Sequence, residues 1–178
     1  MPQISEREFE VLPLRVHAFL ADVPLHDVWA VDLQRARSGI TLDEFLRTAS
    51  ARPCTLPPVV RALLNIRLFV GRLLGWDREP VATAWETFAT RMTAADHSKT
   101  LAPMGTREGL FRVVYRFENE QLLELINRTA HAAALSVLVE TANSYRFYFA
   151  VYVRTVPPCA VLFSVSSKQL RPTRCATR

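Results

Sequence analysis

The stretch from Gly109 to Val156 constrains the fold most, because β-branched and aromatic residues recur in it at strand spacing. Side chains along a strand point alternately to opposite faces, so residues two apart share a face. Here the odd positions are apolar and the even positions are mixed, which is typical of an antiparallel sheet covered on one side. The odd positions comprise Phe111, Val113, Tyr115 and Phe117, then Leu123, Leu125 and Asn127, then His131, Ala133, Leu135, Val137 and Val139, and finally Tyr145, Phe147, Phe149, Val151 and Val153. We therefore predict four strands whose odd-numbered side chains all face one dry interior.

Short polar segments interrupt this stretch where turns are needed. Glu118–Asn119, Asn127–Arg128 and Thr141–Ser144 carry the Asn, Ser and Thr side chains that favour turns. The alternative is a helix over Glu120–Ser136, because that segment also contains Ala, Leu and Glu, which are good helix formers. The β-branched and aromatic residues on both sides of the segment favour the strands.

Ahead of this stretch, the sequence predicts one strand followed by two helices. His26–Leu33 alternates as a strand does. Thr41 and Glu44 have the spacing of a capping box, in which each side chain bonds the backbone N–H of the other, and a helix over Leu42–Ala49 would follow. Proline suits the first turn of the second helix, Pro58–Leu74, in which apolar residues recur at helical spacing.

The other segments have weaker patterns. Ser5–Leu20 predicts an N-terminal arm with a short helix, interrupted by Pro13. Val81–Met92 fits either a strand or another helix, and Asp96–Pro103 predicts a loop. One strand, two helices and a run of consecutive strands indicate an α+β fold rather than a doubly wound α/β fold.

Length and composition indicate one domain over residues 1–178, with residues 1–20 as its arm. Apolar residues make up 49% and charged residues 22% of the chain, as in ordinary soluble globular proteins. The best apolar run, Leu56–Trp76, contains three arginines, so we expect no membrane span. Met1–Glu10 has no apolar signal-peptide core, and we expect a cytoplasmic protein. The three cysteines are widely spaced, which predicts free thiols rather than a metal site or a disulfide set.

The net charge of +5 arises from the last part of the chain. No acidic residue follows Glu140, whereas six basic residues do. Residues 171–178 predict a frayed basic tail rather than a phosphate-binding groove. Because no nucleic-acid-reading motif accompanies this charge, we expect no specific nucleic-acid binding.

Three loose patterns carry a resemblance to a known family. They are Ala21-Asp22 with Asp27-Val28-Trp29-Ala30-Val31, Pro57 to Arg67 with Leu74-Gly75, and Asn119-Glu120 ahead of His131 and Tyr152-Val153-Arg154. In these the chain resembles a bacterial family labelled only as a domain of unknown function, DUF2867. Its order of elements is also similar to the helix-grip architecture of the START and polyketide-cyclase-like (SRPBCC) superfamily. The resemblance implies a curved antiparallel sheet with two helices after the first strand, wrapped around a C-terminal helix. Cys159–Arg178 does not have the pattern of that last helix, so the C-terminal element is poorly defined.

Few polar residues lie among the apolar odd positions, and these are the candidate ligand contacts. They are Tyr115, Asn127, His131 and Tyr145. A mostly apolar pocket with a few convergent polar groups is the usual form of a small-molecule site. Tyr115, Asn127 and His131 are therefore predicted to line such a pocket. The alternative is that they are core residues whose polar atoms bond to neighbouring groups of the protein.

Arg67 is a further candidate, since it lies at the rim of the apolar stripe of the second helix. One role for it is binding an acidic group of a ligand, and the alternative is an ion pair with Glu120 or Asp32. The dipeptide His26-Asp27 is a weak pattern for a metal site. The sequence contains no glycine-rich phosphate loop and no Gly-x-Ser-x-Gly elbow, and we expect no metal and no cofactor.

Three functions are compatible with these observations. The first is a module that binds a small apolar molecule in a cavity between the sheet and the helix Pro58–Leu74. The second is a cyclase- or hydrolase-type enzyme in which His131 acts as acid or base and Tyr115 orients the substrate. The third is a structural or partner-binding domain with a filled core. We expect the first, and a cavity that reaches His131 would separate the first two from the third. The sequence does not define the oligomeric state.

Overall fold

The computed structural model describes residues 1–34, 37–51, 86–127 and 130–155, together with isolated positions between 58 and 73. Most of the helix expected over Pro58–Leu74, including Arg67, lies outside the described residues. The chain from residue 156 onward, with its expected basic tail, lies outside them as well. The C-terminal helix of a helix-grip fold would fall in that region, so this part of the fold stays a prediction.

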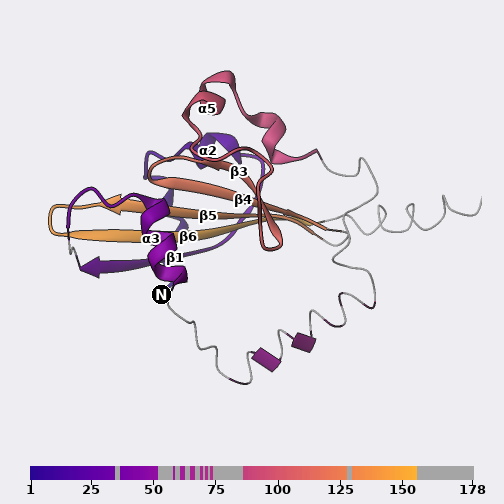
Figure 1. The fold of residues 1–178 in the computed structure, drawn as a ribbon, viewed down its shortest axis with the longest axis horizontal. Coiled ribbons are helices and arrows are strands. Elements are labelled where there is room, and N and C mark those ends of the chain that lie inside the picture. The colour runs from indigo at the N-terminus through magenta and orange to yellow at the C-terminus, as the bar shows by residue number, and fades with distance from the viewer. Residues whose placement is uncertain are drawn as a thin grey trace, which may run out of the picture.

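Six strands form one antiparallel sheet in the order β1-β6-β5-β4-β3-β2 (Figure 1). The strands are β1 Leu25–Gln34, β2 Arg107–Glu108, β3 Phe111–Arg116, β4 Glu120–Ile126, β5 Ala130–Glu140 and β6 Ser144–Thr155. Strands β2 to β6 follow one another as a meander, and β1 pairs with β6 at the other edge. The predicted first strand and the four predicted consecutive strands are confirmed. The competing helix over Glu120–Ser136 is wrong.

Short helices flank the sheet, and hydroxyl side chains begin most of them. They are α1 Glu6–Glu10, α2 Arg15–Phe19, α3 Leu42–Ser50, the 3-10 helix η1 Phe88–Arg91, and α5 Ala94–Lys99. The side chains of Ser5, Thr41, Thr87 and Thr93 each accept a backbone N–H in the first turn of the helix that follows.

Two predictions for these segments need correction. The N-terminal arm forms two helices, α1 and α2, whose apolar side chains Phe9, Val16 and Phe19 are buried. Part of the expected loop over Asp96–Pro103 is helical, because the Thr93 hydroxyl and the Asp96 carboxylate form a capping box at the start of α5. The sequence carries this signal, since Thr93 and Asp96 have capping-box spacing.

The odd-number register holds for β5 and is wrong for β4 and β6. Leu135 of β5 is fully buried, and it pairs with Leu122 of β4 and Ala150 of β6, which are even-numbered and equally buried. Each hairpin beside β5 leaves four residues between its first paired positions. An even number of loop residues makes cross-strand partners opposite in parity, so the shared face alternates between odd and even positions. Phe147 and its odd-numbered neighbours in β6 therefore face the opposite side.

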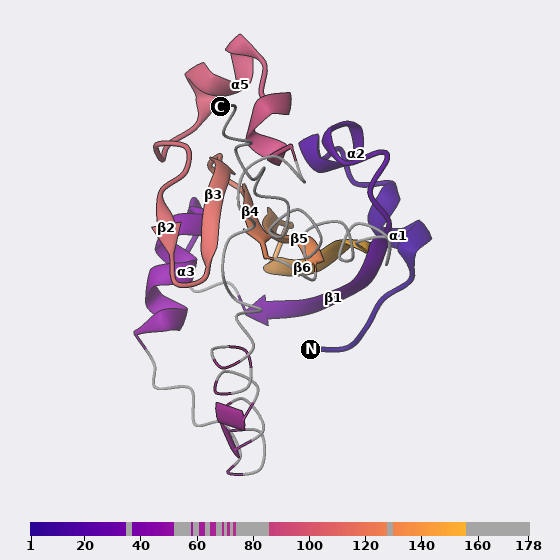
Figure 2. The same cartoon turned by 90° about the vertical axis from the view of Figure 1, so that its right-hand side faces the viewer.

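The sheet is curved and carries a hydrophobic core on each face, with α1 and α2 over the concave side and α3 on the other (Figure 2). The larger core packs the helices α1, α2 and η1 against the buried side chains of all the longer strands. The smaller core packs Leu42 of α3 against Leu138 and Tyr145. The expectation of a sheet covered on one side is therefore wrong. Tyr145 belongs to the smaller core and not with Tyr115 and His131.

Candidate functional site

Tyr115 is a buried hydrogen-bond donor to a buried carboxylate. Its hydroxyl lies 2.5 Å from Oε1 of Glu120, at the start of β4. The backbone N–H groups of Arg15 and Val16, at the start of α2, donate to the two oxygens of the same carboxylate at 3.0 Å each. The N-cap residue of α2, Leu14, has no side chain able to accept them. Glu120 therefore replaces the missing cap and attaches α2 to the sheet.

The surroundings of Tyr115 keep its hydroxyl protonated. Burial raises the pKa of Tyr115 well above its ordinary value, and the negative charge of Glu120 raises it further. The ring is stacked on Phe117 with 4.6 Å between centroids and meets the edge of Phe19 at 5.5 Å. Tyr115 is thus placed as a donor within the core.

A second carboxylate, that of Asp96, also binds the start of α2. Arg15 donates from Nε to Oδ1 at 2.9 Å and from Nη2 to Oδ2 at 2.7 Å, a bidentate pair. The backbone N–H and the hydroxyl of Thr93 also donate to Asp96, at 3.0 and 2.7 Å. The hydrogen bond from Arg15 is the main reason that the pKa of Asp96 lies well below its ordinary value, although burial opposes this. The helix α2 is therefore fixed both to β4 and to α5.

His131 forms a second buried pair on the same face of the sheet. Its Nε2 atom lies 2.7 Å from Oε1 of Glu124, and both side chains are almost completely excluded from solvent. The Thr87 hydroxyl donates to the other oxygen of Glu124 at 2.7 Å, and the backbone N–H of Phe88 donates to Oε1 at 2.6 Å. Burial would raise the pKa of Glu124, but the hydrogen bonds from His131, Phe88 and Thr87 together lower it below its ordinary value. Glu124 therefore binds the start of η1 as Glu120 binds the start of α2.

Phe88 covers the imidazole of His131. The two rings are stacked with 3.9 Å between their centroids. The guanidinium carbons of Arg91 and Arg154 lie 5.3 and 5.8 Å from the centroid of Phe88. Both arginines bind Asp22, Arg91 at 2.5 and 2.9 Å and Arg154 at 2.6 Å. The hydrogen bond from Arg91 is the main reason that the pKa of Asp22 falls from 3.8 to about 2.

The two buried pairs are separate. Glu120 and Glu124 lie four residues apart along one strand, which is roughly 13 Å at strand spacing. Asn127 is nearly buried just beyond the end of β4. Tyr115 and His131 therefore bond to different carboxylates rather than converging on one point.

A pocket of about 580 Å³ opens elsewhere on the concave face, between the α1–α2 segment and the adjoining ends of β1 and β6. Its lining residues are Glu6, Phe9, Glu10, Val16, His17, Leu20, Ala21, Asp22, Val23, Pro24, Leu25 and Tyr152. None of the predicted contacts Tyr115, Asn127 and His131 is among them. The predicted cavity against the helix Pro58–Leu74 lies outside the described residues.

Two polar side chains line this pocket without a hydrogen-bond partner among the described residues. Tyr152 is 5% exposed, and its hydroxyl makes no hydrogen bond within the described part of the chain. Burial raises the pKa of Tyr152 most, and the negative charges of Glu120, Glu6 and Glu10 raise this pKa further. The Nε2 atom of His17 is buried and has no hydrogen-bond partner among the described residues. The ring of His17 meets Phe9 edge-on, with 5.1 Å between centroids.

Sequence reasoning missed both of these residues. Tyr152 is even-numbered, so the uniform odd register placed it on the wrong face. His17 belongs to no sequence motif, so no pattern singled it out. The sequence did carry a signal for another part of this pocket. The helical spacing of Glu6, Phe9 and Glu10 places these three side chains on one side of α1.

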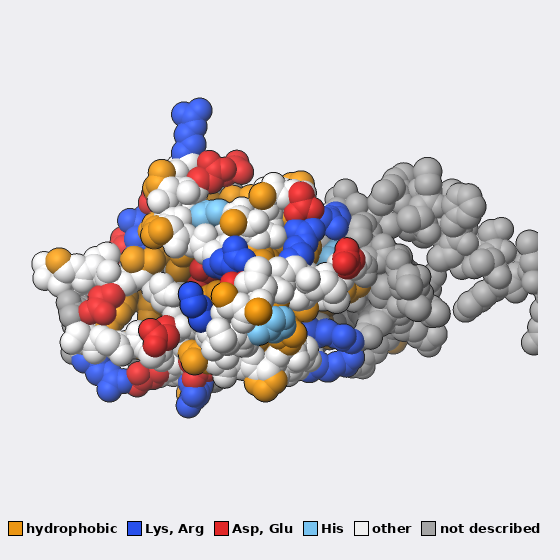
Figure 3. All heavy atoms as spheres, turned by 90° about the horizontal axis from the view of Figure 1, so that it is seen from above, with side chains coloured by type: hydrophobic (Ala, Val, Ile, Leu, Met, Phe, Trp, Pro, Cys, Tyr) orange, Lys and Arg blue, Asp and Glu red, His pale blue; other side chains and the backbone are white. Residues whose placement is uncertain are grey.

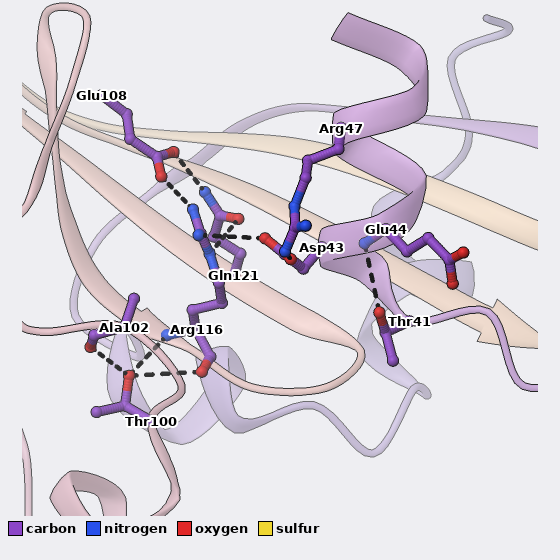
Figure 4. A network of polar contacts seen from close by, with 9 residues as sticks. All are labelled: Thr41, Asp43, Glu44, Arg47, Thr100, Ala102, Glu108, Arg116 and Gln121. Atoms are coloured by element: carbon purple, nitrogen blue, oxygen red, sulfur yellow. Dashed lines mark hydrogen bonds and ion pairs between the residues drawn. The ribbon is translucent and has the colours of Figure 1, made fainter. Parts of the chain in front are cut away.

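The opposite face carries a polar network that joins α3 to β2, β3 and β4 (Figure 4). Arg116 donates to Gln121 Oε1 at 3.0 Å and to Asp43 Oδ1 at 3.3 Å, and it also binds Glu108. Gln121 donates to Glu108 at 3.2 Å. Every polar group in this network contacts another member, so the network fastens α3 of the smaller core rather than offering a site.

Tyr145 and Asp32 also have structural partners. The Tyr145 hydroxyl donates to the carbonyl of Arg37 and accepts from the N–H of Ile40, each at 3.0 Å. Asp32 lies 3.7 Å from Arg146. The suggested ion pair of Arg67 with Glu120 or Asp32 involves a residue outside the described ranges.

The described surface gives few signs of other ligands. Among the described residues, no three His, Cys, Asp or Glu side chains gather as a metal site would require. None of the described helices has both the length and the apolar character needed to cross a membrane. On the face that carries α2 and α5, basic and acidic side chains are interspersed (Figure 3). This mixture differs from the single-sign patch that nucleic-acid binding requires.

Together these features define an α+β protein with an open, six-stranded antiparallel sheet and helices on both faces. The chain belongs to the family described as "Protein of unknown function (DUF2867)", whose model matches residues 19–156. The family resemblance seen in the sequence is therefore confirmed, and the matched residues include most of the pocket lining. No curated protein and no solved structure matches the chain.

Proposed function

We propose that this chain is a small-molecule-binding module that takes an apolar molecule into the pocket between α1–α2 and the sheet. The pocket itself carries this proposal. Its volume of about 580 Å³ lies within the range typical of small-molecule sites. Six of its lining residues are larger apolar side chains, namely Phe9, Val16, Leu20, Val23, Pro24 and Leu25. Such walls favour an apolar guest, since transfer of apolar surface out of water drives its binding.

The two unpartnered polar side chains support the same function. A buried polar group without a hydrogen bond costs about 1–3 kcal/mol in protein stability. His17 incurs this cost at its buried Nε2 atom, and Tyr152 lines the same pocket. A guest with one polar group would supply their missing partner and fix its own orientation, as in other mostly apolar sites.

The proposal includes a place for the chain in the START superfamily. Its support is the curved antiparallel sheet with α3 after the first strand, together with a pocket on the concave face. The closing C-terminal helix of that architecture, and a cytoplasmic location, are predictions that accompany it.

An enzyme that uses His131 is the second candidate, and one observation favours it. Glu124 lies 2.7 Å from the imidazole and would orient it as an acid or base. However, His131 is fully buried and stacked beneath Phe88, so a substrate could reach it only if Phe88 moved. The open pocket therefore supports binding better than this pair supports catalysis.

Native mass spectrometry of the purified full chain tests the binding proposal. Ala21 is exposed and lines the pocket, so an Ala21→Trp variant places an indole at its mouth without disturbing the core. Ala18 is equally exposed in the adjoining α2 helix but does not line the pocket, so Ala18→Trp is the matched control. We expect a co-purifying small molecule, or added 1-hexanol, to bind the wild type and Ala18→Trp and not Ala21→Trp. Equal binding by all three proteins, or by none, would contradict the proposal.

A further inference from the structure

We infer that the preferred guest of this pocket is an organic cation with an apolar body, such as a protonated alkylamine. This inference rests on the proposed function and narrows it to one ligand class. It comes from three features of the pocket: its charged lining, the hydroxyl of Tyr152 and its aromatic rings.

The charged side chains that the described residues contribute to this pocket are all acidic. Among the described residues, Glu6, Glu10 and Asp22 contribute carboxylates to the lining, and no Lys or Arg does so. Asp22 already binds two arginines, so it contributes no net negative charge to the pocket. Glu6 and Glu10 lie one turn apart on α1, on the same side as the buried ring of Phe9. The carboxylates of Glu6 and Glu10 therefore make the electrostatic potential at the opening of the pocket negative.

The hydroxyl of Tyr152 offers a hydrogen-bonding group to a cationic guest in this pocket. Tyr152 as a residue is nearly buried and lines the pocket, and its hydroxyl has no protein partner within the described residues. Its pKa is raised by burial and by the charges of Glu120, Glu6 and Glu10, so the hydroxyl stays neutral in a negative field. A neutral phenol oxygen accepts a hydrogen bond from an ammonium N–H. It could also donate to an anion, but an anion would then be repelled by the same three carboxylates.

Aromatic rings complete the match to a cation. Phe9 and Tyr152 both line the pocket, and the negative face of an aromatic ring attracts cations. The apolar residues Leu20 and Val23 remain for the alkyl body of the guest. An alkylammonium ion therefore satisfies the carboxylates, the phenol and the apolar wall together.

Isothermal titration of the full chain with three probes of equal length tests this inference. The probes are hexylammonium chloride, 1-hexanol and sodium hexanoate at pH 7. We expect hexylammonium to bind about fivefold more tightly than hexanol, and hexanoate to bind more weakly than either, because each exposed carboxylate adds a modest attraction.

Variants of α1 identify the source of the preference. Glu6→Gln with Glu10→Gln should remove the advantage of hexylammonium over hexanol while leaving hexanol binding unchanged. Glu8→Gln is the matched control, because Glu8 lies on the same helix, binds Arg146 and does not line the pocket. It should leave the preference within about twofold of the wild type.

The outcomes separate the two proposals. If hexanol binds and hexylammonium shows no advantage, the cation inference is overturned and the binding proposal stands. If hexanoate binds most tightly, the cation inference is likewise overturned. If none of the three probes binds, both proposals fail. A preference that survives in the Glu6→Gln, Glu10→Gln double variant also overturns the inference.

Discussion

At the scale of single residues, two carboxylates of one strand account for much of the internal order. Glu120 and Glu124 are both buried, and each accepts hydrogen bonds from the start of a helical segment and from one side chain of the sheet. A buried carboxylate is tolerated only when its oxygens are bonded in this way. The side chains of Tyr115 and His131 have that role, whatever else they do.

Replacement of His131 tests this role. His131→Ala should lower the free energy of unfolding by about 3 kcal/mol, because it leaves a cavity beneath Phe88 and deprives a buried carboxylate of its partner. His97, exposed on α5, offers a matched control, and His97→Ala should change stability by less than about 0.5 kcal/mol. Urea denaturation measures both variants. A His131→Ala protein as stable as the wild type would show that the pair with Glu124 does not support the fold.

At the scale of elements, carboxylates rather than long helices hold the layers together. Glu120 and Asp96 fix α2 to β4 and α5, and Asp22 fixes η1 to β6 through Arg91 and Arg154. The helices α1 and α2 have five residues each, too few to be stable alone in water. Their place in the fold therefore depends on these tertiary bonds.

Stability should accordingly fall in acid. The pKa values of Asp22, Asp96 and Glu124 are lower in the folded protein than their ordinary values, and that of Asp22 falls from 3.8 to about 2. Above pH 5 these carboxylates are ionised in both states, so their stabilising effect is complete. As the pH falls through 4 toward 2, the unfolded chain takes up protons first and the effect is lost.

Urea denaturation at pH 7, 5 and 3 measures this dependence. We expect a similar free energy of unfolding at pH 7 and 5 and a clear decrease at pH 3. Asp22→Asn should weaken the decrease between pH 5 and 3, because one of the shifted groups is then absent. A wild-type protein that is equally stable at pH 5 and 3 would contradict the proposed stabilising role of these carboxylate hydrogen bonds and ion pairs.

The sequence was most informative about the individual strands and helices. Alternation and turn residues predicted every strand from β3 to β6, and Thr41 marked the start of α3. The shared face of those strands was not predicted correctly. The loop length decides whether the buried positions of the next strand are odd- or even-numbered, and four-residue loops switch them from one to the other. The irregularity between Val113 and Tyr115 in β3 changes parity once more, and alternation alone gives no sign of it.

At the scale of the whole molecule, the pocket is a product of tertiary packing. Its walls come from residues 6–20, which were expected to form an arm, from residues 21–25 that follow them, and from one tyrosine of β6. No local pattern joins Tyr152 to Phe9 or Leu20, so the sequence identified candidate polar residues in the sheet and not the site. The cavity that the sequence predicted, against the helix Pro58–Leu74, lies outside the described residues and stays a prediction.

The pocket between α1–α2 and the sheet is the central claim, and chemical-shift mapping tests it most directly. The measurement is a ¹H–¹⁵N spectrum of the full chain during titration with 1-hexanol. We predict that the amide signals of Leu20, Val23 and Tyr152 shift with a common saturation curve, while those of Leu42 and Leu138 on the opposite face stay in place. Shifts confined to the face that carries α3, or no saturable shift at all, would contradict the account.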